Sequence, residues 1–181
     1  TAITASLMFS SVGFPYWPWQ TDLMPVLAVA LLAFVSTLLG RGKKERMGTA
    51  ESRHGRSAAQ VSANLGIAAI VSSAFVQSWM MDSGRFARVS GAPVLAFAVG
   101  LAALAEAAAD TASSEVGQVL GGRPRMITTL RRVEAGTDGG VSVAGTLAGV
   151  VAAAIVAAAG AVALEGGSVM FWIGCAGGVF G

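Results

Sequence analysis

Apolar residues in this chain run together in long blocks and do not alternate with polar ones. Four such blocks occupy residues 24–39, 60–81, 92–109 and 141–164. A helix needs about 20 apolar residues to cross the roughly 30 Å hydrocarbon layer of a membrane, and each block approaches that length. Continuous blocks favour helices over the alternating strands of a membrane barrel. The pattern therefore predicts four helical membrane spans.

Two further apolar segments, 1–14 and 168–181, look like spans cut short at the ends of the sequence. With them, we predict an all-α fold: a polytopic transmembrane helix bundle of about six spans, the terminal ones incomplete. Residues 1–181 then form a single integral membrane domain.

Composition supports a membrane protein and excludes several other classes. Hydrophobic residues make up 54% of the chain and charged residues only 12%, whereas about a quarter of the residues in a soluble domain are charged. The single cysteine, Cys175, excludes an internal disulfide, and the sequence contains no Cys/His cluster typical of a metal site.

Basic residues gather in two segments between the predicted spans. The segment 41–57 holds six Lys/Arg and the segment 111–140 holds four, which together make ten of the twelve in the chain. Two spans separate these segments, so both lie on the same side of the membrane. The positive-inside rule places them in the cytoplasm and the protein in the cell membrane as a multi-pass protein. Topology thus explains the basic residues without a nucleic-acid partner.

Acids at the end of the third apolar block suggest chemistry. Glu106 and Asp110 are four residues apart and share a helix face. Glu115, Ser114 and neighbouring hydroxyls follow within a turn and a half. Such oxygen ligands suit Mg²⁺ and substrate phosphates, and acids at membrane depth are commonly functional. The alternative is a salt bridge to an arginine of a neighbouring loop, or an ordinary helix end.

A glycine-rich segment precedes the fourth block. Glycines let backbone N–H groups approach an anion, and the positive end of the following helix points to the same place. Two arginines lie close by, and two hydroxyls follow, so the segment is a candidate phosphate site; the alternative is an ordinary polar loop. The residues are Arg131, Arg132, Gly136, Thr137, Asp138, Gly139, Gly140, Ser142 and Thr146.

A polar stripe enters the second block. Arg56, Gln60 and Asn64 are spaced four residues apart, so they share one helix face. The stripe suits a ligand with a charged head and an apolar tail, or else hydrogen bonding between helices. Glycine pairs such as Gly145 and Gly149 indicate close helix packing, which fits a tight bundle and leaves a homodimer open.

Three stretches resemble one known family. They match, in order and spacing, the integral membrane proteins of the phytyl-phosphate kinase type from the vitamin E pathway, long catalogued as a domain of unknown function. There is a more distant similarity to polyprenol and dolichol kinases and to membrane cytidylyltransferases. The stretches are Arg56–Asn64, Ala109–Gly117, and Ile127–Thr129 followed by Gly136–Gly145. Family members continue past a segment like Gly174–Gly181 into a further acidic segment, whose ligands this sequence does not include.

The resemblance implies a polytopic enzyme that phosphorylates an isoprenyl monophosphate, such as phytyl phosphate, at the expense of a nucleoside triphosphate, CTP, with Mg²⁺. Asp110 and Glu115 would hold the metal with Asp138 as a third acid, and Arg131 would join them as a catalytic residue. Substrate and nucleotide would be bound by Arg56, Gln60, Asn64, Ser114, Thr128, Thr129, Arg132, Gly136, Thr137, Asp138, Gly139, Gly140 and Ser142.

Two other functions fit the same residues. A cytidylyltransferase-like or other lipid-phosphate transferase could use the same architecture. A transporter could use Glu106 and Asp110 as an ion relay within the membrane, although the halves of the chain show no convincing repeat.

Overall fold

The fold is described here from a computed structural model. It describes residues 23–47, 58–71, 73, 75–76, 78–79, 92–137, 139–163 and 167–180, and for 47, 58–64 and 92–96 it describes the backbone alone. The helices are α2 (Leu23–Leu38), α3 (Arg41–Met47), α4 (Ala58–Val71), α6 (Ala92–Leu120), α7 (Val143–Ala163) and α8 (Gly167–Phe180). Two short strands, β1 (Arg125–Met126) and β2 (Gly140–Val141), pair antiparallel.

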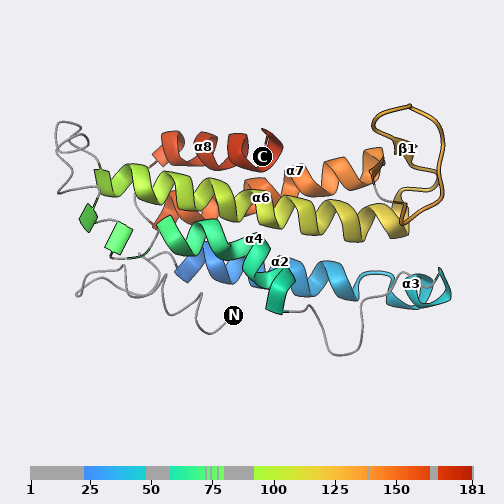
Figure 1. The fold of residues 1–181 in the computed structure, drawn as a ribbon, viewed down its shortest axis with the longest axis horizontal. Helices are drawn as coiled ribbons and strands as arrows, with labels where there is room; N and C mark the ends of the chain where they lie inside the picture. Colours follow the sequence, from blue (N-terminus) through green and yellow to red (C-terminus); the bar gives the residue numbers. More distant parts are fainter. Residues whose placement is uncertain are drawn as a thin grey trace.

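α6 is the axis of the bundle. It has 29 residues, which at 1.5 Å per residue make a rod of about 43 Å. α7 and α8 pack against it and against each other, and α2 and α4 also pack against it, with α2 in contact with α7 as well (Figure 1). Every other long helix therefore takes its position from α6.

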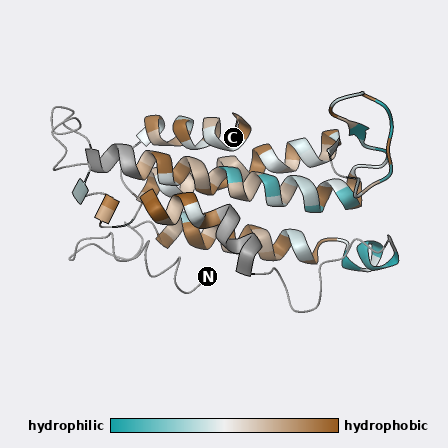
Figure 2. Cartoon of the chain, in the orientation of Figure 1, coloured by the Kyte–Doolittle hydropathy of each residue, from teal (hydrophilic) through white to brown (hydrophobic). Residues whose placement is uncertain are grey.

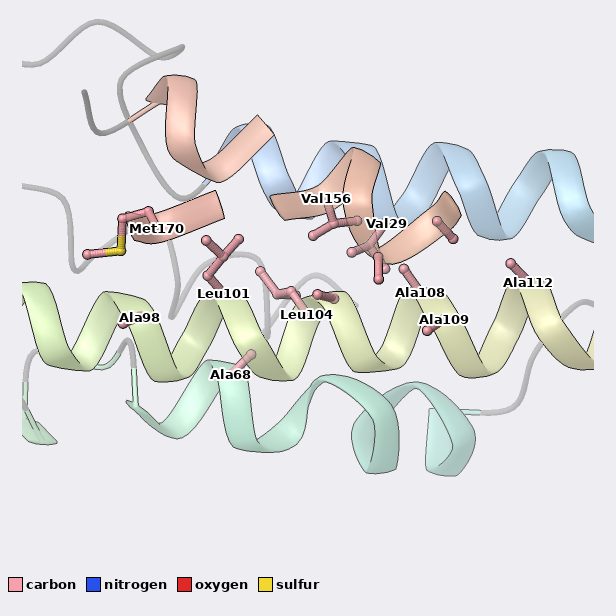
Figure 3. Packing of buried hydrophobic residues seen from close by; sticks show 13 residues of the cluster. Val29, Ala68, Ala98, Leu101, Leu104, Ala108, Ala109, Ala112, Val156 and Met170 are labelled. Carbon is pink, nitrogen blue, oxygen red and sulfur yellow. The ribbon is translucent and has the colours of Figure 1, made fainter. Parts of the chain in front are cut away.

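The core consists mostly of alanine with a few larger side chains. Leu101 and Leu104 of α6 meet Val156 of α7, Met170 of α8 and Val29 of α2, all nearly inaccessible (Figure 3). Because alanines surround these residues, neighbouring helices lie close together. In a membrane the hydrophobic effect does not drive helices together, so they associate through close packing of small side chains.

The outer surface is apolar along the bundle and polar at one end. Large hydrophobic side chains such as Phe34, Ile70 and Val162 are exposed. Polar residues gather where α3 and the loop around β1 lie (Figure 2). An apolar flank with a polar end is the surface expected of a helical membrane protein.

The all-α prediction is confirmed, since the described residues are mostly helical and the β1–β2 pair has only two residues in each strand. The number of spans stays a prediction. Judged by length and composition, α7 is the one helix among the described residues that is long and apolar enough to cross a membrane. α2 and α8 are shorter apolar helices.

Two helix boundaries and one strand pair differ from expectation. α6 continues to Leu120, through residues that we expected in a connecting loop. α4 ends at Val71, short of Met81; just beyond it, the Ser73 hydroxyl donates to the Ile70 carbonyl, an interaction that competes with the helix ladder. The β1–β2 pair lies within the basic segment, where we expected no strand.

Candidate functional site

The last turns of α6 present one polar face. Asp110, Ser114 and Gln118 are four residues apart, with Ser113 and Gly117 beside them. Residues at this spacing lie on one side of a helix. All five line the same cavity. The continuation of α6 to Leu120 is therefore what aligns these groups along one wall.

The glycine-rich loop forms the opposite wall as consecutive tight turns. The amide of Thr137 donates to the carbonyl of Glu134 at 3.2 Å, and that of Gly140 donates to the carbonyl of Thr137 at 3.0 Å. Gly136 and Gly139 have φ values of 91° and 74°, a backbone region that glycine adopts at little cost. Among the described residues of 136–140, the amides of Gly136 and Gly139 donate to no backbone carbonyl, and the same holds for the amides of Glu134 and Ala135 just before them.

The third wall is the start of α7. Ser142 caps this helix, since its hydroxyl oxygen accepts a hydrogen bond from the amide of Gly145 at 3.1 Å. Thr146 follows on the cavity side. The first turn of a helix carries a partial positive charge from its unpaired N–H groups. An anion in the cavity would therefore lie near this helix start.

Glycines let α7 approach α6 closely, as the sequence predicted. A Cβ atom on Gly145 would lie 2.6 Å from the carbonyl oxygen of Ser113, and one on Gly149 would lie 3.1 Å from that of Ala109. Neither position has room for a side chain unless the helices move apart.

Together these walls enclose a polar cavity of about 400 Å³. Hydroxyl groups and glycine backbone dominate its lining, and Asp110 is the one charged residue among the described lining residues. The lining residues are Asp110, Ser113, Ser114, Gly117, Gln118, Pro124, Ala135, Gly136, Thr137, Gly139, Gly140, Val141, Ser142, Gly145 and Thr146.

A second hollow, of about 300 Å³, continues from the first between α6, α7 and α8. The two share Asp110, Ser113 and Thr146. Val150 and Val179 line the second hollow and are 43% and 51% exposed, so it opens on the apolar flank of the bundle. A polar cavity and a laterally open, more apolar hollow therefore meet at Asp110.

Glu106 lies in this second hollow together with Asp110. The shared helix face predicted for these two acids is thus confirmed. Across from them are Thr146 and Val150 of α7.

Glu115 is placed elsewhere. It is paired with Lys44 of α3, and their side chains are 8% and 3% exposed. The Lys44 ammonium also donates to the carbonyls of Ser36 and Thr37 at the end of α2. Glu115 does not line the cavity that holds Asp110. A salt bridge was one of our two readings of these acids, and for Glu115 the partner is a lysine of the other basic segment.

Several predicted binding residues are not brought to the cavity. Arg131, Arg132, Thr128 and Thr129 are exposed in the loop between β1 and β2 and are not among its lining residues. Arg56 and Asp138, and the side chains of Gln60 and Asn64, lie outside the described part of the chain. Their roles stay predictions.

Within the described ranges, no three His, Cys, Asp or Glu side chains converge as a metal site. The donors around Asp110 are one carboxylate and several hydroxyls. Mg²⁺ is commonly held by one or two carboxylates, water and substrate phosphates. The residues present fit that mode of binding, in which the phosphates supply the other ligands.

Two polar side chains of the cavity were absent from the predicted set, those of Ser113 and Gln118. Their spacing from Asp110 was a readable signal, because three and eight residues fall on the same side of a helix. We did not use this spacing because we expected the residues after Asp110 to form a loop.

This arrangement defines a class: an integral membrane helix bundle with a polar cavity at one end that opens sideways onto its apolar flank. The chain belongs to the family described as integral membrane protein DUF92, whose pattern matches residues 2–181. The family resemblance found in the sequence is therefore confirmed.

Curated relatives support the same membership. The protein is 42% identical to an uncharacterized membrane protein, MJ0933, of Methanocaldococcus jannaschii over 45% of this chain and 34% of the relative. It is 34% identical to an uncharacterized membrane protein, sll0875, of Synechocystis over 78% of this chain and 51% of the relative. It is 29% identical to the chloroplastic protein VTE6 of Arabidopsis thaliana over 75% of this chain and 38% of the relative.

The chain thus spans about a third to a half of the length of these relatives. No solved structure matches it. Membrane association follows from the family.

Proposed function

We propose that this protein is a membrane isoprenoid-phosphate kinase, which transfers a phosphoryl group from a nucleoside triphosphate to an isoprenyl monophosphate. The observation that carries the proposal is the meeting of two hollows at Asp110: one polar and lined by hydroxyls and glycine backbone, the other open to the apolar flank. A lipid phosphate has the same two halves. Its head would lie in the polar cavity and its chain in the second hollow.

The chemistry required of the protein is mostly positioning. In the transfer, the bond between the terminal phosphorus and its bridging oxygen breaks, an oxygen of the lipid phosphate bonds to that phosphorus, and a nucleoside diphosphate leaves. Such reactions depend on alignment and on stabilisation of charge. The start of α7 and the amides of Gly136 and Gly139 offer partial positive charge to the phosphates.

A cation completes the proposal. Asp110 is negative and would repel phosphate groups at short range unless a cation lay between them. We propose Mg²⁺ in this place, held by Asp110 and by phosphate oxygens, where it would neutralise charge on the phosphates. CTP as donor and phytyl phosphate as acceptor are proposed from the family resemblance, as are the roles of Arg131, Arg132, Asp138 and Arg56.

The cytoplasmic placement of the two basic segments and a homodimer remain proposals from the sequence.

Substitution of Asp110 tests the function. We expect Asp110→Asn to abolish transfer while the protein still inserts and purifies as the wild type does, because the amide removes the charge that would hold the cation. The assay uses the purified full chain, Mg²⁺, labelled nucleoside triphosphate and a panel of isoprenyl monophosphates. Glu134→Gln is the matched control, since Glu134 is an exposed acid that does not line the cavity.

Each outcome of this assay has a meaning. Wild-type rates in Asp110→Asn contradict the site, and a wild type that transfers nothing contradicts the function. Pyrophosphate in place of nucleoside diphosphate as the product would identify a cytidylyltransferase. Ion flux through proteoliposomes without nucleotide would favour the transporter.

A further inference from the structure

One buried side-chain atom of a cavity-lining residue has no hydrogen-bond partner in the described part of the chain. The side-chain oxygen of Gln118, Oε1, is buried and accepts no hydrogen bond from the residues described. Gln118 itself lines the polar cavity. Folded proteins rarely leave a buried acceptor without a donor, since the group has lost its water and gained nothing in exchange. A donor supplied by a ligand would remove this cost.

The position of Gln118 along the cavity indicates which part of a ligand would supply the donor. It follows Asp110 by eight residues on the same face of α6, which corresponds to about 12 Å along the axis. The apolar hollow meets the cavity at Asp110 and does not include Gln118. Gln118 is therefore at the end of the cavity farthest from the proposed lipid.

A nucleoside triphosphate fits this geometry in one orientation. Its terminal phosphate must reach the lipid phosphate at Asp110, so its base points away, toward the other end of α6. The bases carry N–H groups on their edges, such as the amino groups of cytosine and adenine. A carboxamide oxygen is a natural acceptor for such a group.

We propose that Gln118 is a specificity-determining residue, whose Oε1 accepts a hydrogen bond from an N–H group of the nucleotide base. The assignment rests on the proposed phosphoryl transfer. It adds a residue that reads the base and is separate from those that handle phosphate.

Gln118→Met tests the assignment. Methionine has a similar length and offers neither the carbonyl acceptor nor the amide donor. We expect the KM for the preferred nucleotide to rise by up to about tenfold, the effect of one lost hydrogen bond, and the ranking among CTP, UTP, ATP and GTP to flatten. The KM for the lipid phosphate and kcat at saturating nucleotide should stay at wild-type values, because those steps take place at the Asp110 end.

Two further variants sharpen the test. Gln118→Glu keeps an acceptor oxygen in place and should retain most of the nucleotide affinity. Leu120→Met puts methionine at an exposed position of the same turn, where 63% of the leucine is accessible, and should leave every constant unchanged. Without ligand, Gln118→Met should unfold at the same temperature as the wild type or higher, because an unpartnered buried acceptor has been removed.

Several results would overturn the assignment. An unchanged nucleotide KM in Gln118→Met means that water or nothing satisfies Oε1. A raised KM for the lipid phosphate alone places the lipid head there. A lower unfolding temperature without ligand shows that Oε1 has a partner within the protein. If the wild type transfers normally, these results remove only the role of Gln118; if it transfers nothing, the proposed function fails as well.

Discussion

Asp110 and Glu115 are five positions apart on α6 and have opposite surroundings. Five residues at 3.6 per turn place them roughly 140° apart around the helix. Asp110 is exposed to the cavity, whereas Glu115 is buried against Lys44. Proximity in sequence suggested that both acids would bind one metal. The helical geometry separates them, and the role of Glu115 as a metal ligand is the part of the predicted site that the structure supports least.

The buried pair leads to a prediction on stability. We expect Lys44→Met to lower the free energy of unfolding by about 3–5 kcal/mol, because it removes the ammonium group that is paired with the buried Glu115 carboxylate. Thermal or detergent-induced unfolding of the purified protein measures this. The control is Arg41→Met, which breaks an exposed pair with Glu45 and should cost less than about 1 kcal/mol.

A double variant separates the structural role of Glu115 from a catalytic one. Lys44→Met combined with Glu115→Leu removes both charges, so most of the lost stability should return. If Glu115 serves structure alone, the double variant should also transfer phosphate at near wild-type rates. Full stability with no transfer would instead support Glu115 as a metal ligand.

At the scale of elements, the contact between α6 and α7 shapes the site. Gly145 and Gly149 allow the two helices to touch, and the cavity lies where α7 begins beside the polar face of α6. The width of the cavity therefore depends on having glycine, with no side chain, at these two positions. An added methyl group at this contact has to push the helices apart.

Gly145→Ala is expected to destabilise the fold by about 1–3 kcal/mol through overpacking and to slow transfer, because its Cβ would lie 2.6 Å from the carbonyl oxygen of Ser113. Gly66→Ala in α4 is the matched control. A Cβ at that position meets nothing within 4 Å, and alanine favours a helix over glycine by up to about 1 kcal/mol. Equal unfolding temperatures for the two variants would contradict the close contact.

At the scale of the whole molecule, the described parts of the two basic segments lie at the same end of the bundle. Counting spans placed the basic segments on one side, and the structure places α3 and the β1–β2 loop at the same end of the bundle (Figure 1). Lys43 even donates to the carbonyl of Val119, at the end of α6. The side of the membrane on which this end lies is still a prediction.

Labelling of single cysteines tests that side. In a Cys175→Ala background, we expect cysteines at Glu45 and Thr129 to react with an impermeant thiol reagent in inside-out vesicles and to be protected in right-side-out ones. Both positions are exposed at the polar end. Ser168, exposed at the start of α8, should show the reverse pattern. Labelling of all three from one face would contradict the topology.

The sequence was a good guide to helices and a partial guide to the site. Blocks of apolar residues are long and continuous, so the helical class and the glycine contacts could be predicted. The end of α6 could not, because residues 110–117 are hydroxyl-rich and acidic, a composition also common in turns. Because this boundary was not predicted, Gln118 was not recognised as a cavity residue. The pairing of Lys44 with Glu115 joins residues 71 positions apart, and no local pattern encodes it.

The sideways opening of the second hollow has a kinetic consequence. Val150 and Val179 place its mouth on the apolar flank, so an acceptor would arrive by diffusion within the bilayer and never dissolve in water. The proposed enzyme would then respond to the mole fraction of acceptor among the surrounding lipids. Adding inert phospholipid at fixed acceptor and enzyme should slow turnover, whereas diluting the whole suspension with buffer at fixed nucleotide should leave the rate per enzyme unchanged.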